Sequence, residues 1–264
     1  MSALYPQFIL LGDSLIQRTV VHDDCFVFQA KLEEKCTRRL DIINRGFSGW
    51  NTKNILDYFE KIFPTRSETS AQIDYLVILL GANDAVLPLP GTWQHVPLEK
   101  YGENLSAIIT HPRIQAHNPK ILLVTPPPLD EIKAGEDDRK EGFPEPIRRA
   151  AVTAKYAQKA RDVAAKHDNV TLIDLNKAIM DKAIELVPGD YEPGGPLPGT
   201  PENGKRGGLE KLLLDGLHLG GLAYQVFYDI LSPHVGPEWE NLPVTDRTGY
   251  VFPDWREFEP SKPN

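Results

Sequence analysis

Long apolar runs, basic clusters and cysteines are scarce in this sequence of 264 residues. No stretch approaches the roughly 20 apolar residues that a membrane-spanning helix needs, so we expect no integral membrane segment. The formal net charge is −8 and no segment concentrates lysine or arginine, which argues against a protein that binds nucleic acid or an anionic membrane. A small neutral partner agrees better with this charge.

Signs of secretion and of disulfide chemistry are also missing. The first residues, MSALYPQ, have neither a basic start nor a long apolar segment, so we expect a cytoplasmic protein. The two cysteines, Cys25 and Cys36, fall in what the pattern predicts to be one helical stretch. Such a helix would hold them roughly 16 Å apart along its axis, which is too far for a disulfide.

Signatures of nucleotide binding are absent as well. The first apolar run is followed by neither Gly-x-Gly-x-x-Gly nor a lysine-containing phosphate loop, and Asp13 would repel a phosphate. We therefore expect no cofactor. A nucleotide or flavin binder stays as a rival interpretation, against which colourless purified protein would count.

Short apolar runs alternate with helical patterns along the chain. The runs are residues 8–11, 41–44, 75–80, 121–124 and 170–173. The clearest helix is predicted within residues 144–168, with Pro146 in its first turn. This alternation is typical of a parallel sheet covered on both faces. We therefore predict an α/β fold, a doubly wound three-layer α/β/α sandwich around five parallel strands, in one domain over residues 1–264.

Two regions depart from this pattern. Residues 188–208, PGDYEPGGPLPGTPENGKRGG, predict a long surface loop, for which a tolerated insertion is favoured over a lid. Residues 242–264 form an irregular tail with four aromatic residues, Tyr250, Phe252, Trp255 and Phe258. Aromatics at this density pack either on the body of the same chain or on a partner subunit, in which case the tail forms a homodimer.

The turn after the first strand carries a candidate nucleophile. Ligands of doubly wound sheets bind beyond the carboxyl ends of the strands, which is where Gly12-Asp13-Ser14 falls. Ser14 would stand at the start of a helix, with its own N–H available to a developing negative charge. The alternative is that Ser14 only caps that helix.

A base and further donors follow in other turns. Asp215 and His218 stand three positions apart before an apolar helix, so that one turn can present a carboxylate and an imidazole together. The alternative is that Asp215 caps the turn and His218 is a half-buried surface residue. Gly49 in NRGFSGWNT, with Gly46 as the competing choice, and Asn83 in GANDA are candidate oxyanion donors. Alternatively, both segments are ordinary turns.

Apolar residues beside these motifs predict the wall of a substrate pocket. They are Leu15, Ile16, Val86 and Leu217.

Taken together, the four segments resemble the GDSL, or SGNH, hydrolases. The chain matches the family's blocks in order as Gly12-Asp13-Ser14-Leu15, the NRGFSGWNT segment, Gly81-Ala82-Asn83-Asp84 and Asp215-Gly216-Leu217-His218. The resemblance covers residues 8 to about 232 and implies a flavodoxin-like sandwich. It makes Ser14 the nucleophile, His218 the base and Asp215 its orienting carboxylate. The implied oxyanion hole is the Ser14 N–H, the Gly49 N–H and the Asn83 side chain.

The function implied is that of a serine esterase acting through an acyl-enzyme on a small ester, with an acetyl or short-chain acyl group and a small alcohol. The intact first block, the length and the loop before Asp-x-x-His are most like the isoamyl acetate-hydrolysing esterase group. Alternatives within the family are an acetylesterase acting on sugars and a lysophospholipase or thioesterase. Asn83→Ala is expected to cost about a hundred- to a thousandfold in turnover if Asn83 is an oxyanion donor.

Two rivals come from other classes. A metal-dependent phosphoesterase would use hard ligands at the same sheet edge, namely Asp13, Asn83, Asp84, Asp215 and His218. No close cluster of histidine and carboxylate stands out in the sequence, so we predict no metal site. The other rival is a catalytically silent scaffold, against which the complete set of Ser, Asp, His and Asn argues.

Overall fold

The computed structural model describes residues 4–22, 26–243 and 246–258. A sheet of five parallel strands lies at its centre, in the order β2-β1-β3-β4-β5. The strands are β1 (Gln7–Gly12), β2 (Asp41–Gly46), β3 (Ile73–Leu79), β4 (Lys120–Val124) and β5 (Val170–Ile173). All five predicted strands are confirmed, and the order is that of flavodoxin-like sheets, with the switch point between β1 and β3.

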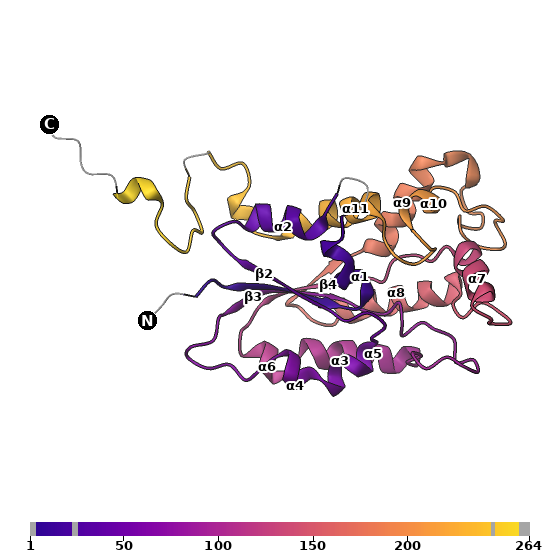
Figure 1. The fold of residues 1–264 in the computed structure, drawn as a ribbon, viewed down its shortest axis with the longest axis horizontal. Helices are drawn as coiled ribbons and strands as arrows, with labels where there is room; N and C mark the ends of the chain where they lie inside the picture. Colours follow the sequence, from indigo (N-terminus) through magenta and orange to yellow (C-terminus); the bar gives the residue numbers. More distant parts are fainter. Residues whose placement is uncertain (1–3, 23–25, 244–245, 259–264) are drawn as a thin grey trace.

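Helices cover both faces of this sheet, as Figure 1 shows. The α-helices are α1 (Ser14–Gln17), α2 (Phe28–Cys36), α3 (Thr52–Asp57), α4 (Phe59–Ile62), α5 (Leu98–Ile109), α6 (Pro112–Gln115), α7 (Glu131–Lys140), α8 (Ala150–Ala164), α9 (Leu175–Leu186), α10 (Leu209–Leu212) and α11 (Gly221–Leu231). Short 3₁₀ turns are η1 (Arg18–Val20), η2 (Pro188–Asp190), η3 (Ser232–His234), η4 (Pro237–Trp239) and η5 (Trp255–Phe258). One face packs against α2, α9, α10 and α11, and the other against α3, α4, α5, α6 and α8. The predicted three-layer sandwich is therefore confirmed.

The two hydrophobic cores follow from the alternation of side chains along each strand. In β1, Phe8 and Leu10 point into the core beneath α2 and α11, whereas Ile9 and Leu11 point into the core beneath α5 and α8. All four are almost fully buried. A strand buried on both faces needs an unbroken apolar run, and such runs make these strands predictable from the sequence.

Helix α8 begins later than the sequence predicted. Its apolar stripe packs as expected, with Tyr156 and Ala160 buried, but the first helical residue is Ala150 and Pro146 lies outside the helix. The segment before it is held outside the helix by other contacts. The amide of Ile147 donates to the Asp138 carboxylate at 2.9 Å, and the Ile147 carbonyl accepts from the Leu87 amide at 2.8 Å. These tertiary hydrogen bonds override the local preference for a helix start at proline.

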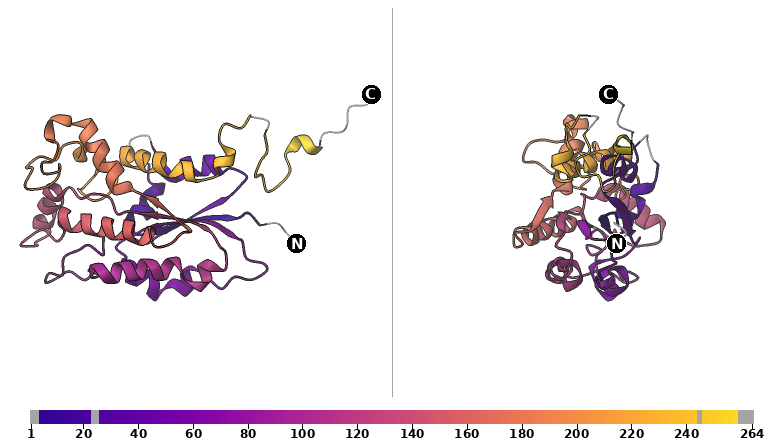
Figure 2. Two further views of the ribbon diagram at one scale, coloured as in Figure 1. Left: turned by 180° about the vertical axis from the view of Figure 1, so that it is seen from behind. Right: turned by 90° about the vertical axis from the view of Figure 1, so that its left-hand side faces the viewer.

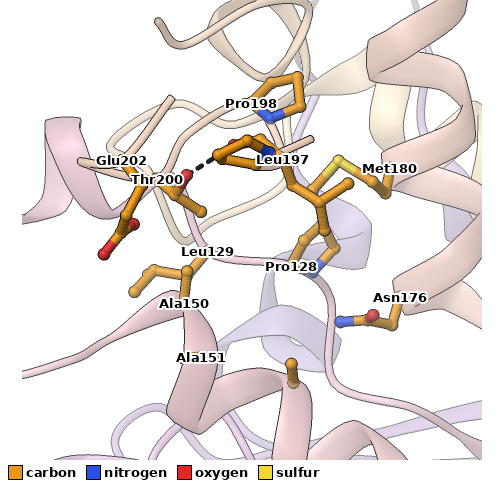
Figure 3. Close-up of a pocket in the computed structure, with 12 residues that line it drawn as sticks. Pro128, Leu129, Ala150, Ala151, Asn176, Met180, Leu197, Pro198, Thr200 and Glu202 are labelled. Carbon is orange, nitrogen blue, oxygen red and sulfur yellow. Dashed lines mark hydrogen bonds between the residues drawn. The ribbon is translucent and has the colours of Figure 1, made fainter. Parts of the chain in front are cut away.

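Residues 188–208 begin with the 3₁₀ turn at Pro188–Asp190 and continue as an irregular loop. The side-chain amide of Asn203 braces the loop by donating to the carbonyls of Asp190 at 2.9 Å and Pro196 at 2.8 Å. Together with Pro128 and with α8 and α9, the loop lines an apolar cavity of about 300 Å³ (Figure 3). No residue of this loop lines the cavity around Ser14, and its role as insertion or lid stays a prediction.

Part of the C-terminal tail packs on the turn between α2 and β2. The Tyr250 ring stacks against the guanidinium groups of Arg38 and Arg39, at 4.7 and 4.8 Å from the ring centroid. The Val251 amide donates to the Arg38 carbonyl at 3.0 Å. Figure 2 shows η5 projecting away from the body, where the Trp255 side chain is 60% exposed. Packing on the same chain thus accounts for Tyr250, and the homodimer through this tail stays a prediction.

Cys36 is buried in α2, and burial raises the pKa of its thiol to about 12. The prediction of one helical stretch over both cysteines is wrong, because α2 begins only at Phe28, after Val27 in an extended conformation. Cys25 itself lies outside the described residues. Within the described ranges, no helix is both long and apolar enough to cross a membrane.

Candidate active site

Ser14 stands at the turn between β1 and α1, at the carboxyl edge of the sheet. Gly12 ends the strand where no side chain fits, since an added Cβ would lie 2.4 Å from the Leu79 carbonyl oxygen. Asp13 caps α1, because its carboxylate accepts a hydrogen bond from the Leu15 amide at 2.9 Å. The cap is therefore Asp13 and not Ser14, which leaves the Ser14 hydroxyl available to other partners.

The predicted base and its carboxylate lie beside this hydroxyl. The Oγ of Ser14 is 2.9 Å from Nε2 of His218, and Nδ1 of the same ring is 2.6 Å from Oδ2 of Asp215. When Nδ1 carries the proton and donates it to the carboxylate, Nε2 is an acceptor and can take the hydroxyl proton of Ser14. The fold thus joins residues 204 positions apart into one hydrogen-bonded chain.

The Asp215 carboxylate also holds its own turn. Its Oδ1 accepts from the backbone amides of Leu217 at 3.0 Å and His218 at 2.8 Å. Burial alone would raise the pKa of Asp215, but the hydrogen bonds from the side chain and backbone of His218 outweigh burial and hold the pKa well below its usual value. The two interpretations of Asp215, turn cap and orienting carboxylate, therefore describe the same side chain.

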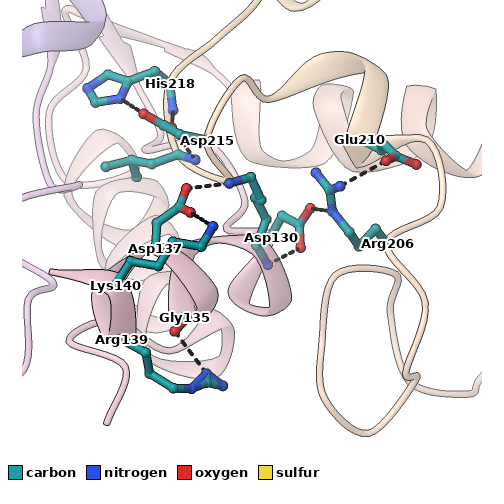
Figure 4. Close-up of polar contacts among 11 residues, drawn as sticks. Asp130, Gly135, Asp137, Arg139, Lys140, Arg206, Glu210, Asp215 and His218 are labelled. Atoms are coloured by element: carbon teal, nitrogen blue, oxygen red, sulfur yellow. Dashed lines mark hydrogen bonds and ion pairs between the residues drawn. The ribbon is translucent and has the colours of Figure 1, made fainter. Parts of the chain in front are cut away.

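Helix α7 packs against this turn (Figure 4). The Asp130 amide donates to the Gly216 carbonyl at 2.9 Å, and a Cβ on Gly216, whose φ is +87°, would lie 2.6 Å from the Asp130 carbonyl oxygen. The fully buried Asp130 carboxylate accepts from the Lys133 amide at 3.2 Å, which caps α7, and from Arg206 at 2.6 Å. The end of the 188–208 loop is thereby tied to the helix that supports the Asp215–His218 turn.

The two predicted oxyanion donors from later turns reach the same cavity as the Ser14 hydroxyl. Gly49 lies in the turn after β2 with a φ of +80°, where glycine is favoured. The Nδ2 of Asn83 donates to the Trp50 carbonyl at 2.9 Å. Gly46, the competing choice, does not line the cavity. An added Cβ there would lie 2.0 Å from the Gln17 amide nitrogen, so Gly46 allows close packing against α1.

The cavity measures about 480 Å³, and much of its wall was missed by sequence reasoning. The missed lining residues are Ser48, Gln94, Ala134, Asp137, Asp138, Lys140, Glu141, Ile147 and Arg148. They come from the turn after β2, from the loop before α5, from α7 with the residue that follows it, and from the segment before α8. A run of charged residues such as 136–141 is typical of a solvated helix face, and nothing in its spacing indicates that it borders a cavity.

The predicted apolar wall is mostly wrong. Leu217 lines the cavity, but Leu15, Ile16 and Val86 do not. These three are at most 1% exposed and belong to the interior. Successive helical residues point about 100° apart, so when Ser14 faces the cavity the next two residues of α1 turn toward the core.

Asp84, one of the carboxylates proposed as metal ligands in the rival interpretation, is only half satisfied by the protein. Its Oδ1 accepts from the amide and hydroxyl of Thr52 at 3.0 and 2.5 Å, whereas its buried Oδ2 has no hydrogen-bond partner. Across the described part of the chain, no three His, Cys, Asp or Glu side chains are grouped as a metal site.

Two buried carboxylates lie behind the candidate nucleophile. Burial, together with repulsion from Asp84, raises the pKa of Asp13 to about 7, and burial raises the pKa of Asp84 to about 6. An acid whose pKa is raised on folding holds its proton more tightly in the folded state. The stability that it contributes is therefore greatest in acid and is lost as the pH rises from about 4 to about 7.

Asp13→Asn is expected to flatten this pH dependence, because asparagine keeps the acceptor for the Leu15 amide and cannot ionise. The melting temperature, measured by scanning fluorimetry from pH 5 to pH 8, should fall less in the variant than in the wild type. Parallel curves, separated only by a constant offset from lost contacts, would show that Asp13 does not titrate in this range.

Comparisons with known proteins identify the family of this chain. The GDSL-like lipase/acylhydrolase family matches residues 10–226. The isoamyl acetate-hydrolyzing esterase 1 homolog of Rattus norvegicus is 28% identical over 271 residues, which is 99% of this chain and 92% of that protein. A GDSL esterase/lipase of Arabidopsis thaliana is 32% identical over 174 residues, 64% of this chain and 70% of that protein.

Solved structures share the fold. A lipase/acylhydrolase from Enterococcus faecalis superposes with a TM-score of 0.59 at 23% identity, covering 88% of this chain and 96% of that one. A catalytic mutant of an acetylxylan esterase from Geobacillus stearothermophilus gives a TM-score of 0.58 at 16% identity, covering 92% of this chain and all of that one, 100%. By the extent of the family match, the chain belongs to the GDSL-like lipase/acylhydrolase family.

Proposed function

We propose that this GDSL-family esterase hydrolyses carboxylic esters of short acyl chains, foremost acetyl esters of small alcohols, through an acyl-enzyme on Ser14. The observation that carries the proposal is the hydrogen-bonded chain from the Ser14 hydroxyl through His218 to Asp215. Gly49 and Asn83 line the same cavity and supply the donors that an oxyanion needs.

In the proposed reaction, Oγ of Ser14 attacks the ester carbonyl carbon while Nε2 of His218 takes the hydroxyl proton. The N–H groups of Ser14 and Gly49 and Nδ2–H of Asn83 donate to the carbonyl oxygen as it becomes negative. His218, held by Asp215, then protonates the alcohol oxygen as the ester C–O bond breaks. Water attacks the acyl-enzyme with the same proton transfers in turn, releasing the carboxylic acid and restoring Ser14.

The lining of the cavity supports a small substrate. Five charged side chains face it, namely Asp137, Asp138, Lys140, Glu141 and Arg148. A long alkyl chain would displace water from these groups without replacing their hydrogen bonds. The apolar part of the wall is limited to Ala134, Ile147 and Leu217, which suits a short acyl chain. The polar wall also favours a second candidate, acetylated sugars, and one of the structural relatives carries the name acetylxylan esterase.

A chain-length series tests the proposal. The p-nitrophenyl esters from acetate to palmitate are assayed in parallel with and without a chelator, and the acyl-enzyme is sought by mass spectrometry of the Ser14 peptide. We expect kcat/KM to be highest from acetate to butyrate, with no effect of the chelator and with an acetyl group on Ser14. A maximum at palmitate would contradict the short-chain proposal. Loss of activity with the chelator would support the metal-dependent rival, and folded but inactive protein would support the scaffold. Acetylated xylose assayed beside p-nitrophenyl acetate separates the two candidate alcohols.

A further inference from the structure

The side chain of Asn83 can serve an oxyanion only in one of its two amide orientations. The torsion that turns an asparagine amide is broad and roughly two-fold, and its oxygen and nitrogen ends have almost the same shape. An amide turned by 180° would aim a carbonyl oxygen at the negative charge and repel it. Something in the site must therefore select the orientation that presents N–H.

Two donors from separate loops meet the oxygen end of this amide. Nη2 of Arg148 and Nε2 of Gln94 each lie 3.2 Å from Oδ1 of Asn83. At the nitrogen end, one N–H donates to the Trp50 carbonyl at 2.9 Å, whereas Oδ2 of Asp13 lies 3.5 Å away, a long contact that leaves the second N–H available to an oxyanion. Turning the amide over would set its N–H groups against two donors and its oxygen against the Trp50 carbonyl. The two donors and this carbonyl therefore favour the same orientation.

Gln94 also links the amide to the other proposed donor. Its Nε2 donates to the Gly49 carbonyl at 2.7 Å, and its own backbone carbonyl accepts from the Asn51 side chain at 2.7 Å. One glutamine amide thus contacts both Asn83 and the turn that carries the Gly49 N–H. The two loops after β2 and β3 are joined at the point where both present donors to the cavity.

Arg148 lies in the irregular segment before α8. Its Nε donates to the Ala82 carbonyl at 3.2 Å, and its Nη2 donates to Oδ1 of Asn83, so the planar guanidinium group binds two consecutive residues. A cationic donor on an amide oxygen also polarises the amide and strengthens its N–H groups as donors. Because α8 begins only at Ala150, Arg148 lies outside the helix, in the segment that lines the cavity.

We infer that Gln94 and Arg148 are positioning residues for the proposed ester hydrolysis: they hold the Asn83 amide with its N–H toward the oxyanion, and Gln94 also fixes the Gly49 turn. The inference rests on the proposed function, because it assigns their effect to the tetrahedral intermediate. It predicts that both residues act on turnover and that Arg148 acts only through Asn83.

Double-mutant cycles test this. Arg148→Met and Gln94→Leu are made in the wild type and in Asn83→Ala, and kcat and KM are measured with p-nitrophenyl acetate. Each single variant is expected to lower kcat about ten- to a hundredfold, as for the loss of a hydrogen bond to a charged group or of an oxyanion-hole support, with KM nearly unchanged. In the Asn83→Ala background, Arg148→Met should lower kcat by less than about twofold. Gln94→Leu should still lower kcat in this background, but only by the loss that arises from the Gly49 turn.

The control is Arg139→Met, because Arg139 lies on α7 near the cavity, donates to the Gly135 carbonyl and does not line the cavity. It should leave kcat unchanged. Equal losses from Arg148→Met in both backgrounds, or a change in KM alone, would overturn the inference and indicate direct contact with substrate. A negligible effect of Asn83→Ala would also overturn it, whereas full activity in Ser14→Ala would overturn the proposed function itself. Should Arg148→Met fail to fold, the Gln94→Leu cycle decides the question separately.

Discussion

Ser14→Ala is expected to lower kcat for p-nitrophenyl acetate by about a millionfold, the size of the effect found when the nucleophile of a serine protease is removed. Without Oγ no acyl-enzyme forms, and His218 at 2.9 Å loses the hydroxyl whose proton it would take. The residual rate should come from water held near the intact oxyanion donors. Mass spectrometry of the variant after incubation with the ester should find no acetyl group on the peptide that contains position 14.

The chain offers a matched control for this variant. Ser106 also lies within hydrogen-bond distance of a histidine, with Oγ 3.2 Å from Nε2 of His167, but neither residue lines the cavity. Ser106→Ala should therefore hydrolyse the ester at the wild-type rate. Activity within tenfold of wild type in Ser14→Ala, or equal losses in the two variants, would contradict a role of Ser14 as nucleophile.

Asp215→Asn is expected to lower kcat by about ten-thousandfold with KM little changed, as for the same exchange in a serine protease. An asparagine can keep its oxygen toward the amides of Leu217 and His218, which places its NH₂ group against Nδ1 of the ring. The ring then accepts at Nδ1 and carries its proton on Nε2, so it cannot take a proton from Ser14. The variant therefore keeps the geometry of the turn but holds His218 in the tautomer that cannot act as a base.

The melting temperature of Asp215→Asn and the pH dependence of its rate distinguish a tautomer effect from unfolding. The melting temperature should stay close to that of the wild type, and raising the pH should not restore the rate. The control is Asp229→Asn, because Asp229 is an exposed residue on α11. This variant should have the kcat and the melting temperature of the wild type. A loss in Asp215→Asn of less than tenfold would show that the carboxylate does not set the state of His218.

The strands and the short motifs after them could be predicted because both depend on residues that are close together in the sequence. A strand such as β1, buried on both faces, requires an unbroken apolar run, and the turns that follow parallel strands must meet at one edge of the sheet. The sequence alone therefore predicts that Ser14, Asn83 and His218 lie in one site. The glycines of these turns are dictated by close contacts, as at Gly12 and Gly216.

The surroundings of the site could not be read in this way. Gln94 and Arg148 lie in segments without periodicity, and their contacts with Asn83 depend on how distant loops pack. Nearness in sequence was misleading for Leu15 and Ile16, because the helix turns them from the cavity into the core. The start of α8 was misplaced for a related reason, since the hydrogen bonds that hold Ile147 outside the helix come from Leu87 and Asp138 in other segments.

The separation of the catalytic side chains along the chain has a consequence for assembly of the protein. Oγ of Ser14 and Nε2 of His218 are joined across 204 positions, and the irregular loop at residues 188–208 lies between them. Cutting the polypeptide in that loop would leave the nucleophile and both oxyanion turns on a large fragment and the Asp215–His218 turn with α11 on a small one. Neither fragment holds a complete proton relay, so ester hydrolysis would report directly on reassociation of the two halves, and in a ribosome-bound chain it would begin only after the last helix has emerged.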